Sequence, residues 1–561
     1  MRFSVKATAD NQQVCTSSSK SSQKDGGTGR VFLSGVVVLT LSTVLVKLIG
    51  LFFKIPMLHY LGSEGMGYFN AAYEWYATLC IISTSGLPLA SSMLIARADT
   101  AGNATAVRRV ERLAMRVFIL MGVTGTLLLF FGAASISRLI GSPETRFALM
   151  AVAPTILFSC LSGAYRGYFQ GYQDMLPTAI SQIIEAAGKL LLGLTFAILA
   201  WRRGLDAPHV AAWAMLGLSV GVAISTMYLF WHRKGYKAAR DFVSQMKAVE
   251  KETVSLRALL GIAVPVTISS SVMSLTRLFD MAMILRRLQY IGYDGAQANA
   301  LYGNYTTMVV PIFNLIPSLI TSVALALVPT LTAAIKVGDR QTQRSTVGTA
   351  IRLTALLSLP ASLAVAIYSR TILSLLFHGQ EVAVEQSAPM LSVLAVSVFF
   401  SSVITTTNAI LQAYGRVNAP IVSMLAGSAL KLCAAYVLIG IQDVNIYGAP
   451  ISTFICDALI VGINFYLIAK HTDVLGSLKS ALIRPLFTSA LAVGLPGLLY
   501  AVFARLGYAE TPLFLTAVPV TLALYLVLCL RGGLVGETEI SMLPKGISKQ
   551  LTRLCRKTNE S

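Results

Sequence analysis

The chain has 561 residues, of which 55% are hydrophobic and 12% are charged. Soluble domains carry about 25% charged residues, and a water-soluble fold could not keep so much apolar surface away from water. Lysine and arginine outnumber aspartate and glutamate by 45 to 25. In a membrane protein this excess collects in cytoplasmic loops, so it does not indicate binding to nucleic acid. We therefore expect an all-α polytopic membrane protein.

Fourteen apolar segments long enough to cross a bilayer follow one another along the chain. They cover residues 31–55, 73–95, 113–133, 147–170, 177–200, 209–231, 258–284, 301–329, 348–368, 387–412, 418–439, 446–469, 481–503 and 511–531. Helices are expected because a helix satisfies its own backbone hydrogen bonds inside the bilayer. The expected parts of the chain are a disordered cytoplasmic tail (1–30), an N-lobe of six helices (31–231), a cytoplasmic linker (232–257), a C-lobe of six helices (258–469), two additional helices (470–531) and a cytoplasmic tail (532–561).

The distribution of positive charge predicts the orientation of these helices. An even number of crossings places both termini on one side, and by our count 31 of the 45 lysines and arginines lie on that side, against 8 on the other. Because lysine and arginine accumulate in cytoplasmic loops, both termini are expected in the cytoplasm.

An internal repeat is indicated by matching residues at a constant offset. Residues 169–172 (FQGY) and 411–414 (LQAY) are 242 positions apart, and Lys189 and Lys431 share this offset. Because each unit has six helices, both units enter the membrane from the same side. Transporters built from such parallel repeats bind their substrate between the halves, near the middle of the bilayer.

Besides charges near segment ends that we count with the loops, nine ionisable side chains lie inside the apolar segments, where an unpaired charge is costly and often functional. The basic ones are Lys47, Lys54, Arg166, Lys189, Arg277 and Lys431, and the acidic ones are Glu185, Asp280 and Asp457. A cavity lined by these side chains is net cationic, six to three. It suits an anionic ligand such as a phosphate, whose oxygens lysine and arginine bind well.

Structural roles stay open for several of these charges. Lys47 and Lys54 are seven residues apart on one helix face. Lys54 reaches either the cavity or the outer membrane interface, and Lys47 reaches either the cavity or a carboxylate of another helix. Glu74 begins a segment and is assigned to the interface. The pairs spaced for intrahelical ion pairing are Arg277 with Asp280, and Glu185 with Lys189.

Helix-breaking residues interrupt two of the segments. Gly86 and Pro88 lie in the second segment, and Pro311 and Pro317 lie in the eighth. Breaks in early helices of each half are candidate hinges or candidate parts of a binding site. Ordinary proline kinks, which membrane helices tolerate, are the alternative.

Motifs of energy-coupled or covalent chemistry are absent from the sequence. There is no P-loop, no cluster of histidine and cysteine with metal-ligand spacing, and no nucleophile elbow. We therefore expect no enzyme, no cofactor and no metal. An ion gradient, the membrane potential or downstream consumption has to drive any transport.

Five stretches of the chain resemble the stage V sporulation protein B family of polysaccharide-transport proteins, in the multidrug/oligosaccharidyl-lipid/polysaccharide exporter superfamily. They are VLTLSTVLVKLIGLFFKIPMLHYLGSEGMGYFNAAYEWY (38–76), STSGLPLASSMLIAR (83–97), YRGYFQGYQDMLPTAISQIIE (165–185), LRRLQYIGYDGAQANALYGNYTTMVVPIFNLIP (285–317) and LVPTLTAAI (327–335). The resemblance implies a MurJ-type lipid II flippase with fourteen helices, two six-helix lobes around a cationic cavity, and two further helices lining a groove for a lipid tail. Lys47 falls where family flippases carry a basic residue; six positions on, this chain has Phe53, followed by Lys54.

The resemblance and the charges together predict a flippase for an undecaprenyl-pyrophosphate-linked glycan, with lipid II as the preferred substrate. It would act by alternating access, as a monomer in the bacterial cytoplasmic membrane, for peptidoglycan, spore-wall or polysaccharide synthesis. Membrane lipids and cell-wall synthases are candidate partners. The predicted substrate-binding residues are Lys47, Lys54, Arg166, Arg277 and Lys431, and the predicted charge-ordering or coupling residues are Glu185, Lys189, Asp280 and Asp457. A multidrug/cation antiporter on the same scaffold and a non-transporting cell-wall assembly factor are the alternatives.

Overall fold

The computed structural model describes residues 18–244, 256–416, 418–471, 478–532 and 534. Within these ranges all regular structure is helical, so the predicted all-α class is confirmed. Twelve helices in this part of the chain are long and apolar enough to cross a membrane. The finer count of fourteen crossings stays a prediction.

The first group of helices extends from α1 to α7. Its members are α1 (Ser18–Thr84), α2 (Gly86–Thr100), α3 (Ala104–Leu139), α4 (Thr145–Gly171), α5 (Leu176–Gly188), the π-helix η1 (Lys189–Gly193), α6 (Leu194–Arg202) and α7 (Ala207–Ser244). Gly62 divides α1 into two arms, because its φ of 68° and ψ of 176° are not helical. A positive φ favours glycine, which has no Cβ to clash with the backbone.

The second group extends from α8 to α15, and two more helices follow it. Its members are α8 (Leu256–Tyr290), α9 (Gly295–Asn304), the π-helix η2 (Tyr305–Val309), α10 (Val310–Val337), α11 (Arg340–Ile367), α12 (Ser369–Leu376), α13 (Glu381–Ala413), α14 (Asn418–Ile439), the 3-10 helix η3 (Asn445–Tyr447) and α15 (Gly448–His471). The last two helices are α16 (Leu478–Arg505) and α17 (Glu510–Arg531).

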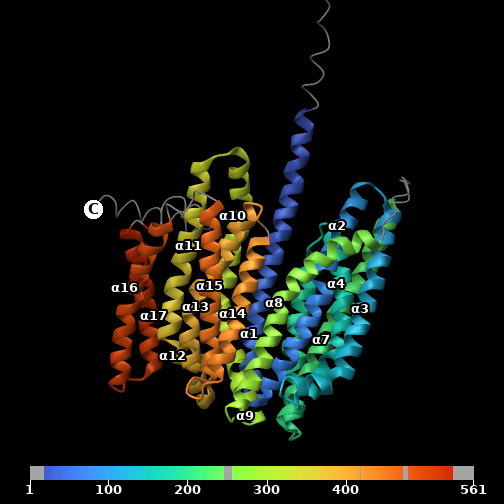
Figure 1. The fold of residues 1–561 in the computed structure, drawn as a ribbon. Helices are drawn as coiled ribbons and strands as arrows, with labels where there is room; N and C mark the ends of the chain where they lie inside the picture. Colours follow the sequence, from blue (N-terminus) through green and yellow to red (C-terminus); the bar gives the residue numbers. More distant parts are fainter. Residues whose placement is uncertain (1–17, 245–255, 417, 472–477, 533, 535–561) are drawn as a thin grey trace, which may run out of the picture.

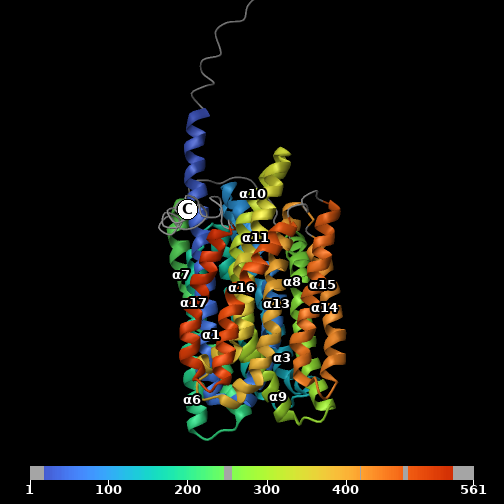
Figure 2. The ribbon, with the colours of Figure 1, turned by 90° about the vertical axis from the view of Figure 1, so that its left-hand side faces the viewer.

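The two groups stand side by side, with α1 and α8 between them (Figure 1). The α16–α17 pair lies at the outer edge of the second group, where α16 packs against α11 and α17 reaches α12 (Figures 1 and 2). The start of α1 and the end of α17 are both at the upper end of the bundle in Figure 1, and α9 is at the lower end.

The two groups meet closely at this lower end, which we call the closed end. A Cβ on Gly67 would lie 2.1 Å from the Asn299 carbonyl oxygen, and a Cβ on Gly303 would lie 2.2 Å from the Ser63 carbonyl oxygen. Both glycines therefore let the backbone of α1 touch α9. The side chains of Arg286 and Gln289 extend the closure by donating hydrogen bonds to carbonyl oxygens at the end of α3.

Several helix ends differ from the positions expected from the sequence. Residues 18–30 are helical, so this part of the predicted disordered tail continues α1, and residues 1–17 lie outside the described residues. The predicted linker begins inside α7, which continues to Ser244, and residues 245–255 are outside the described part. The second arm of α1 starts directly after Gly62, before the predicted position 73, because its small and polar first residues pack on α9.

Candidate functional site

A cavity of about 380 Å³ opens inside the first group, between α1, α4, α5, η1 and α7. Its polar lining consists of Lys47, Arg166, Lys189, Glu185, Gln182, Tyr73 and Tyr76. Three basic side chains thus face one acidic side chain. Four of the nine predicted charges line this cavity, namely Lys47, Arg166, Glu185 and Lys189. They come from three different segments of the sequence, and the fold brings them together.

Arg166 is held in the cavity wall by two partners on α5. Its Nη2 lies 2.8 Å from Glu185 Oε2, and its Nε donates to Ser181 Oγ at 2.9 Å. The predicted intrahelical pair of Glu185 with Lys189 is therefore not formed. The reason is that α4 offers Glu185 a guanidinium from the side.

Lys189 instead points its ammonium at aromatic rings. Its Nζ lies 4.1 Å from the centre of the Tyr73 ring, 5.2 Å from that of Phe53 and 6.0 Å from that of Phe69. Such contacts stabilise a cation by about 0.5–2 kcal/mol. Lys189 is also the first residue of η1, and π-helical turns often mark functional positions. No carboxylate of the described residues lies within ion-pair distance of it.

Lys47 and Lys54 differ in their surroundings although they share a helix face. Lys47 is exposed and lines the cavity, with no ion-pair partner among the described residues. Lys54 is partly buried, and its Nζ donates to the Thr306 carbonyl oxygen at 2.6 Å. Lys54 is therefore held between the helix groups and does not extend to the membrane interface. It is also close enough to Lys189 and Glu74 for their charges to act on it.

Lys431, Asp280 and Asp457 form a second cluster, between α8, α14 and α15. Lys431 Nζ lies 2.7 Å from Asp280 Oδ2, and both side chains are mostly buried, with 16% and 12% exposure. The other oxygen of Asp280 and Oδ2 of Asp457 are buried without a hydrogen-bond partner. This cluster has one cation and two carboxylates, so it is not the cationic part of the site.

Arg277 turns away from Asp280 and toward the first group, so the predicted intrahelical pair of these two residues is wrong. Its Nε lies 3.9 Å from Glu74 Oε2, and its side chain is 55% exposed. The sequence had indicated an interfacial position for Glu74. In the structure Glu74 is instead the acidic partner of a cation on another helix.

The predicted hinge residues lie at two interruptions of regular α-helix. The helical pattern is interrupted at Ser85, directly before Gly86, and a Cβ on Gly86 would lie 2.0 Å from the Ala263 carbonyl oxygen. Pro88 follows within α2, Pro311 is the second residue of α10, directly after η2 and Val310, and Pro317 lies further inside α10. Gly86 therefore serves a close crossing of α2 with α8, and hinge motion at these positions stays a prediction.

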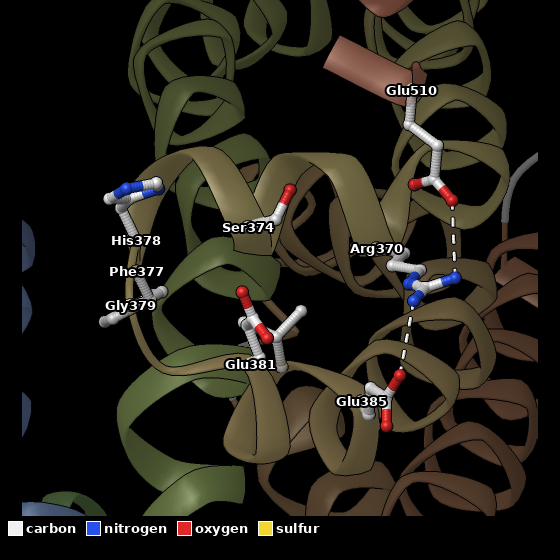
Figure 3. A pocket seen from close by; sticks show the side chains of 9 residues that line it. Arg370, Ser374, Phe377, His378, Gly379, Glu381, Glu385 and Glu510 are labelled. Carbon is white, nitrogen blue, oxygen red and sulfur yellow. Dashed lines mark hydrogen bonds and ion pairs between the residues drawn. The ribbon is translucent and has the colours of Figure 1, made fainter. Parts of the chain in front are cut away.

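A second pocket, of about 240 Å³, is lined by α12, α13 and the start of α17 (Figure 3). Arg370 bridges Glu385 at 3.2 Å and Glu510 at 3.3 Å, and Glu381 also faces this space. Three carboxylates against one guanidinium make this pocket unsuited to an anion. The cationic cavity of the first group is therefore the better candidate site.

Known proteins share both the sequence pattern and the fold. The family profile described as polysaccharide biosynthesis protein matches residues 32–335, and the MatE profile matches residues 305–437. Stage V sporulation protein B of Bacillus subtilis (strain 168) is 23% identical over 522 residues, which cover 92% of this chain and 98% of that protein. The lipid II flippase MurJ of the same organism is 25% identical over 463 residues, covering 78% and 82%.

Two solved structures illustrate the likeness of fold. Lipid II flippase MurJ in an inward closed conformation matches with a TM-score of 0.64 and 14% identity, over 88% of this chain and 98% of that one. An inward-facing multidrug resistance transporter of the MATE family, in the MOP superfamily, matches with a TM-score of 0.58 and 15% identity, over 78% and 99%.

Proposed function

Since the polysaccharide biosynthesis profile matches more than half of the chain, this protein belongs to that family, and from this premise we propose that it flips a polyprenyl-diphosphate-linked glycan across the cytoplasmic membrane. It is a multi-pass membrane protein with flippases and transporters among its relatives. The preferred substrate is lipid II, because a similar protein carries that name. Flipping makes and breaks no covalent bond, so we propose no enzymatic step.

One observation carries this proposal: two lysines without a carboxylate partner in the described part of the chain line the cavity, and a third lies near them. Lys47 and Lys189 line it, and Lys54 is near enough to Lys189 for the two charges to repel each other. A diphosphate placed among them would replace this repulsion by charge-assisted hydrogen bonds, which are about twice as strong as neutral ones. Arg166 would add a fourth cation, oriented by Glu185.

The contacts of the other charged residues suggest a more specific role for each of them. We propose that Lys431 is held by Asp280 and does not bind substrate, and that Arg277 meets the head group only after leaving Glu74. Asp457 and Asp280 each have a buried oxygen without a partner, which makes this cluster the proposed place for charge ordering or ion coupling. Alternating access would bend the protein near Gly86, Pro88, Pro311 and Pro317.

We propose fourteen crossings with both termini in the cytoplasm. The run Leu45–Thr100 has 56 residues, about 84 Å of helix at 1.5 Å per residue, whereas one crossing of the hydrocarbon core needs about 30 Å. The break at Gly62 would make it two crossings, and α9, η2 and α10 would supply one more. The two helix groups would then be the two lobes of a parallel repeat, with the lipid tail along α16 and α17.

A flipping assay tests the proposal. Vesicles containing the purified protein and fluorescent lipid II should expose the lipid to an external reagent faster than empty vesicles do, and Lys189→Met should abolish the difference. Arg505→Met, at the exposed end of α16, is the matched control and should flip normally. Equal rates in protein-containing and empty vesicles would refute lipid II as substrate.

The antiporter alternative is less compatible with the cavity, because an organic cation would meet three basic side chains and one acid.

Depletion of the protein in its host distinguishes a flippase from a non-transporting assembly factor. A flippase leaves a polyprenyl-linked intermediate accumulating on the cytoplasmic leaflet, and the chemical identity of that lipid names the glycan.

A further inference from the structure

We infer that Lys54 is a latch between the two helix groups, and that an anionic ligand in the cavity releases it. The latch is the 2.6 Å hydrogen bond from Lys54 Nζ in α1 to the Thr306 carbonyl oxygen in η2. The inference rests on the proposed function, because the competing anion is the diphosphate proposed above.

The Thr306 carbonyl is available because of the local sequence. In the π-helical turn the Val310 N–H donates to the Tyr305 carbonyl, five residues back. The next donor in this register would be residue 311, which is proline and has no N–H. The Thr306 oxygen therefore lacks a helical donor, and a buried carbonyl without a partner is costly. The Lys54 ammonium supplies the missing bond from the other helix group.

The latch lies beside the closed end of the bundle. The neighbouring Asn70 side chain donates to Thr307 Oγ1 at 2.8 Å, and the tight backbone approach of Gly67 to Asn299 follows one turn away. Among the described residues, α1 packs on α8, α9 and η2, while α10 is not one of its main neighbours. Lys54 therefore joins the first arm of α1 to η2, and Asn70 joins the second arm to the same turn.

An anion would compete directly with the Thr306 carbonyl for the ammonium. The charges of Lys189 and Glu74 both act on the Lys54 ammonium, the first repelling it and the second attracting it. A diphosphate between Lys54 and Lys189 would remove the repulsion and offer a charged acceptor in place of a neutral one. Because charge-assisted bonds are the stronger, the ammonium should transfer to the ligand. Opening of the closed end, which must break this contact, then becomes easier after the ligand has arrived.

The test measures the separation of the two groups at the closed end. The seven native cysteines are first replaced. Spin labels are then placed at two exposed positions, Glu144→Cys directly before α4 and Ala296→Cys in α9. The full chain in lipid nanodiscs is measured by double electron–electron resonance, with and without farnesyl pyrophosphate as a short prenyl diphosphate. We expect one short distance without the probe and a second, longer population with it.

Three variants separate the latch from a general loss of charge. Lys54→Met removes the ammonium, so the longer population should appear without the probe, and probe affinity should fall about tenfold because one charge-assisted bond is lost. Pro311→Ala restores an N–H for Thr306 and keeps Lys54, so it should also lengthen the distance but retain probe affinity. Pro329→Ala, at an exposed proline of the same helix that has no proposed role, should change neither quantity.

The inference is overturned if Lys54→Met leaves the distances unchanged. It is also overturned if Lys54→Met opens the closed end and Pro311→Ala does not, since loss of charge then explains the opening. Binding of the probe to the unmodified protein without any lengthening would overturn release by the ligand. Failure of the proposed function looks different: both variants open the closed end, but the unmodified protein binds no probe.

Discussion

Replacement of Lys431 by methionine tests whether this lysine is a structural ion-pair partner or a free substrate ligand. In the structure its ammonium is 2.7 Å from Asp280, with both side chains mostly buried. Asp457, on the neighbouring helix α15, has a buried oxygen without a partner. Lys431→Met therefore leaves two buried carboxylates with no cation between them.

The cost follows from the burial of this pair. Removing one partner of a buried ion pair typically destabilises a protein by about 3–5 kcal/mol, because the other charge is left uncompensated. Removing both partners is far less costly, so the double variant Lys431→Met/Asp280→Asn should recover more than half of the loss. Lys470→Met, at an exposed lysine near the end of α15, should change stability by less than about 0.5 kcal/mol.

The assay is equilibrium unfolding of the purified protein in mixed micelles, followed by circular dichroism, with farnesyl pyrophosphate affinity measured on the folded double variant. We expect that affinity to stay within about twofold of the unmodified protein, because Lys431 does not line the cavity. If the Lys431→Met protein is stable but no longer binds the probe, Lys431 is a substrate ligand and not a structural ion-pair partner.

Three further predictions concern the cavity, the closed end and the α16–α17 pair. Glu185→Gln should raise the affinity for farnesyl pyrophosphate by about tenfold at low salt, because it removes the one acid that lines the cavity in the described part of the chain and frees Arg166; calorimetry that finds weaker binding would contradict this electrostatic account. Gly67→Val should prevent the approach of α1 to Asn299, where a Cβ would lie 2.1 Å from the carbonyl oxygen; spin-label distances across the closed end should lengthen, whereas Gly50→Val, with open space around its Cβ position, should leave them unchanged. Arg370→Ala should cost less than about 1 kcal/mol, because Arg370 and Glu385 are 59% and 69% exposed; unfolding in micelles that reveals a loss above about 2 kcal/mol would mean that this contact is what holds the pair in place.

The sequence predicts the helices well where apolar length alone decides. It fails at the start of the second arm of α1, where small and polar residues after Gly62 resemble a loop. Their helical state depends on contact with α9, through Gly67 and Asn299, which are more than 200 positions apart. A hydropathy profile cannot predict such a contact, because it measures only the preference of each residue for an apolar or an aqueous environment.

The sequence predicts which charged residues line the candidate site, but it does not predict which of them form ion pairs with one another. Spacing along one helix favoured Glu185 with Lys189, yet the guanidinium of Arg166 on α4 is the actual partner. The aromatic surroundings of Lys189 had a weak signal in the sequence, since Phe69 and Tyr73 lie on α1, more than 100 positions before the lysine. Only the packing of α4 against α5 reveals which charges are neutralised.

The central claim is that the lysines of the cavity bind a diphosphate, and calorimetric titration with farnesyl pyrophosphate tests it most directly. We predict saturable binding to the full-length protein in nanodiscs, and its loss in the variant Lys47→Met/Lys189→Met, with farnesol as a probe that lacks the diphosphate and binds neither protein. Equal affinity of both proteins for farnesyl pyrophosphate would contradict the claim.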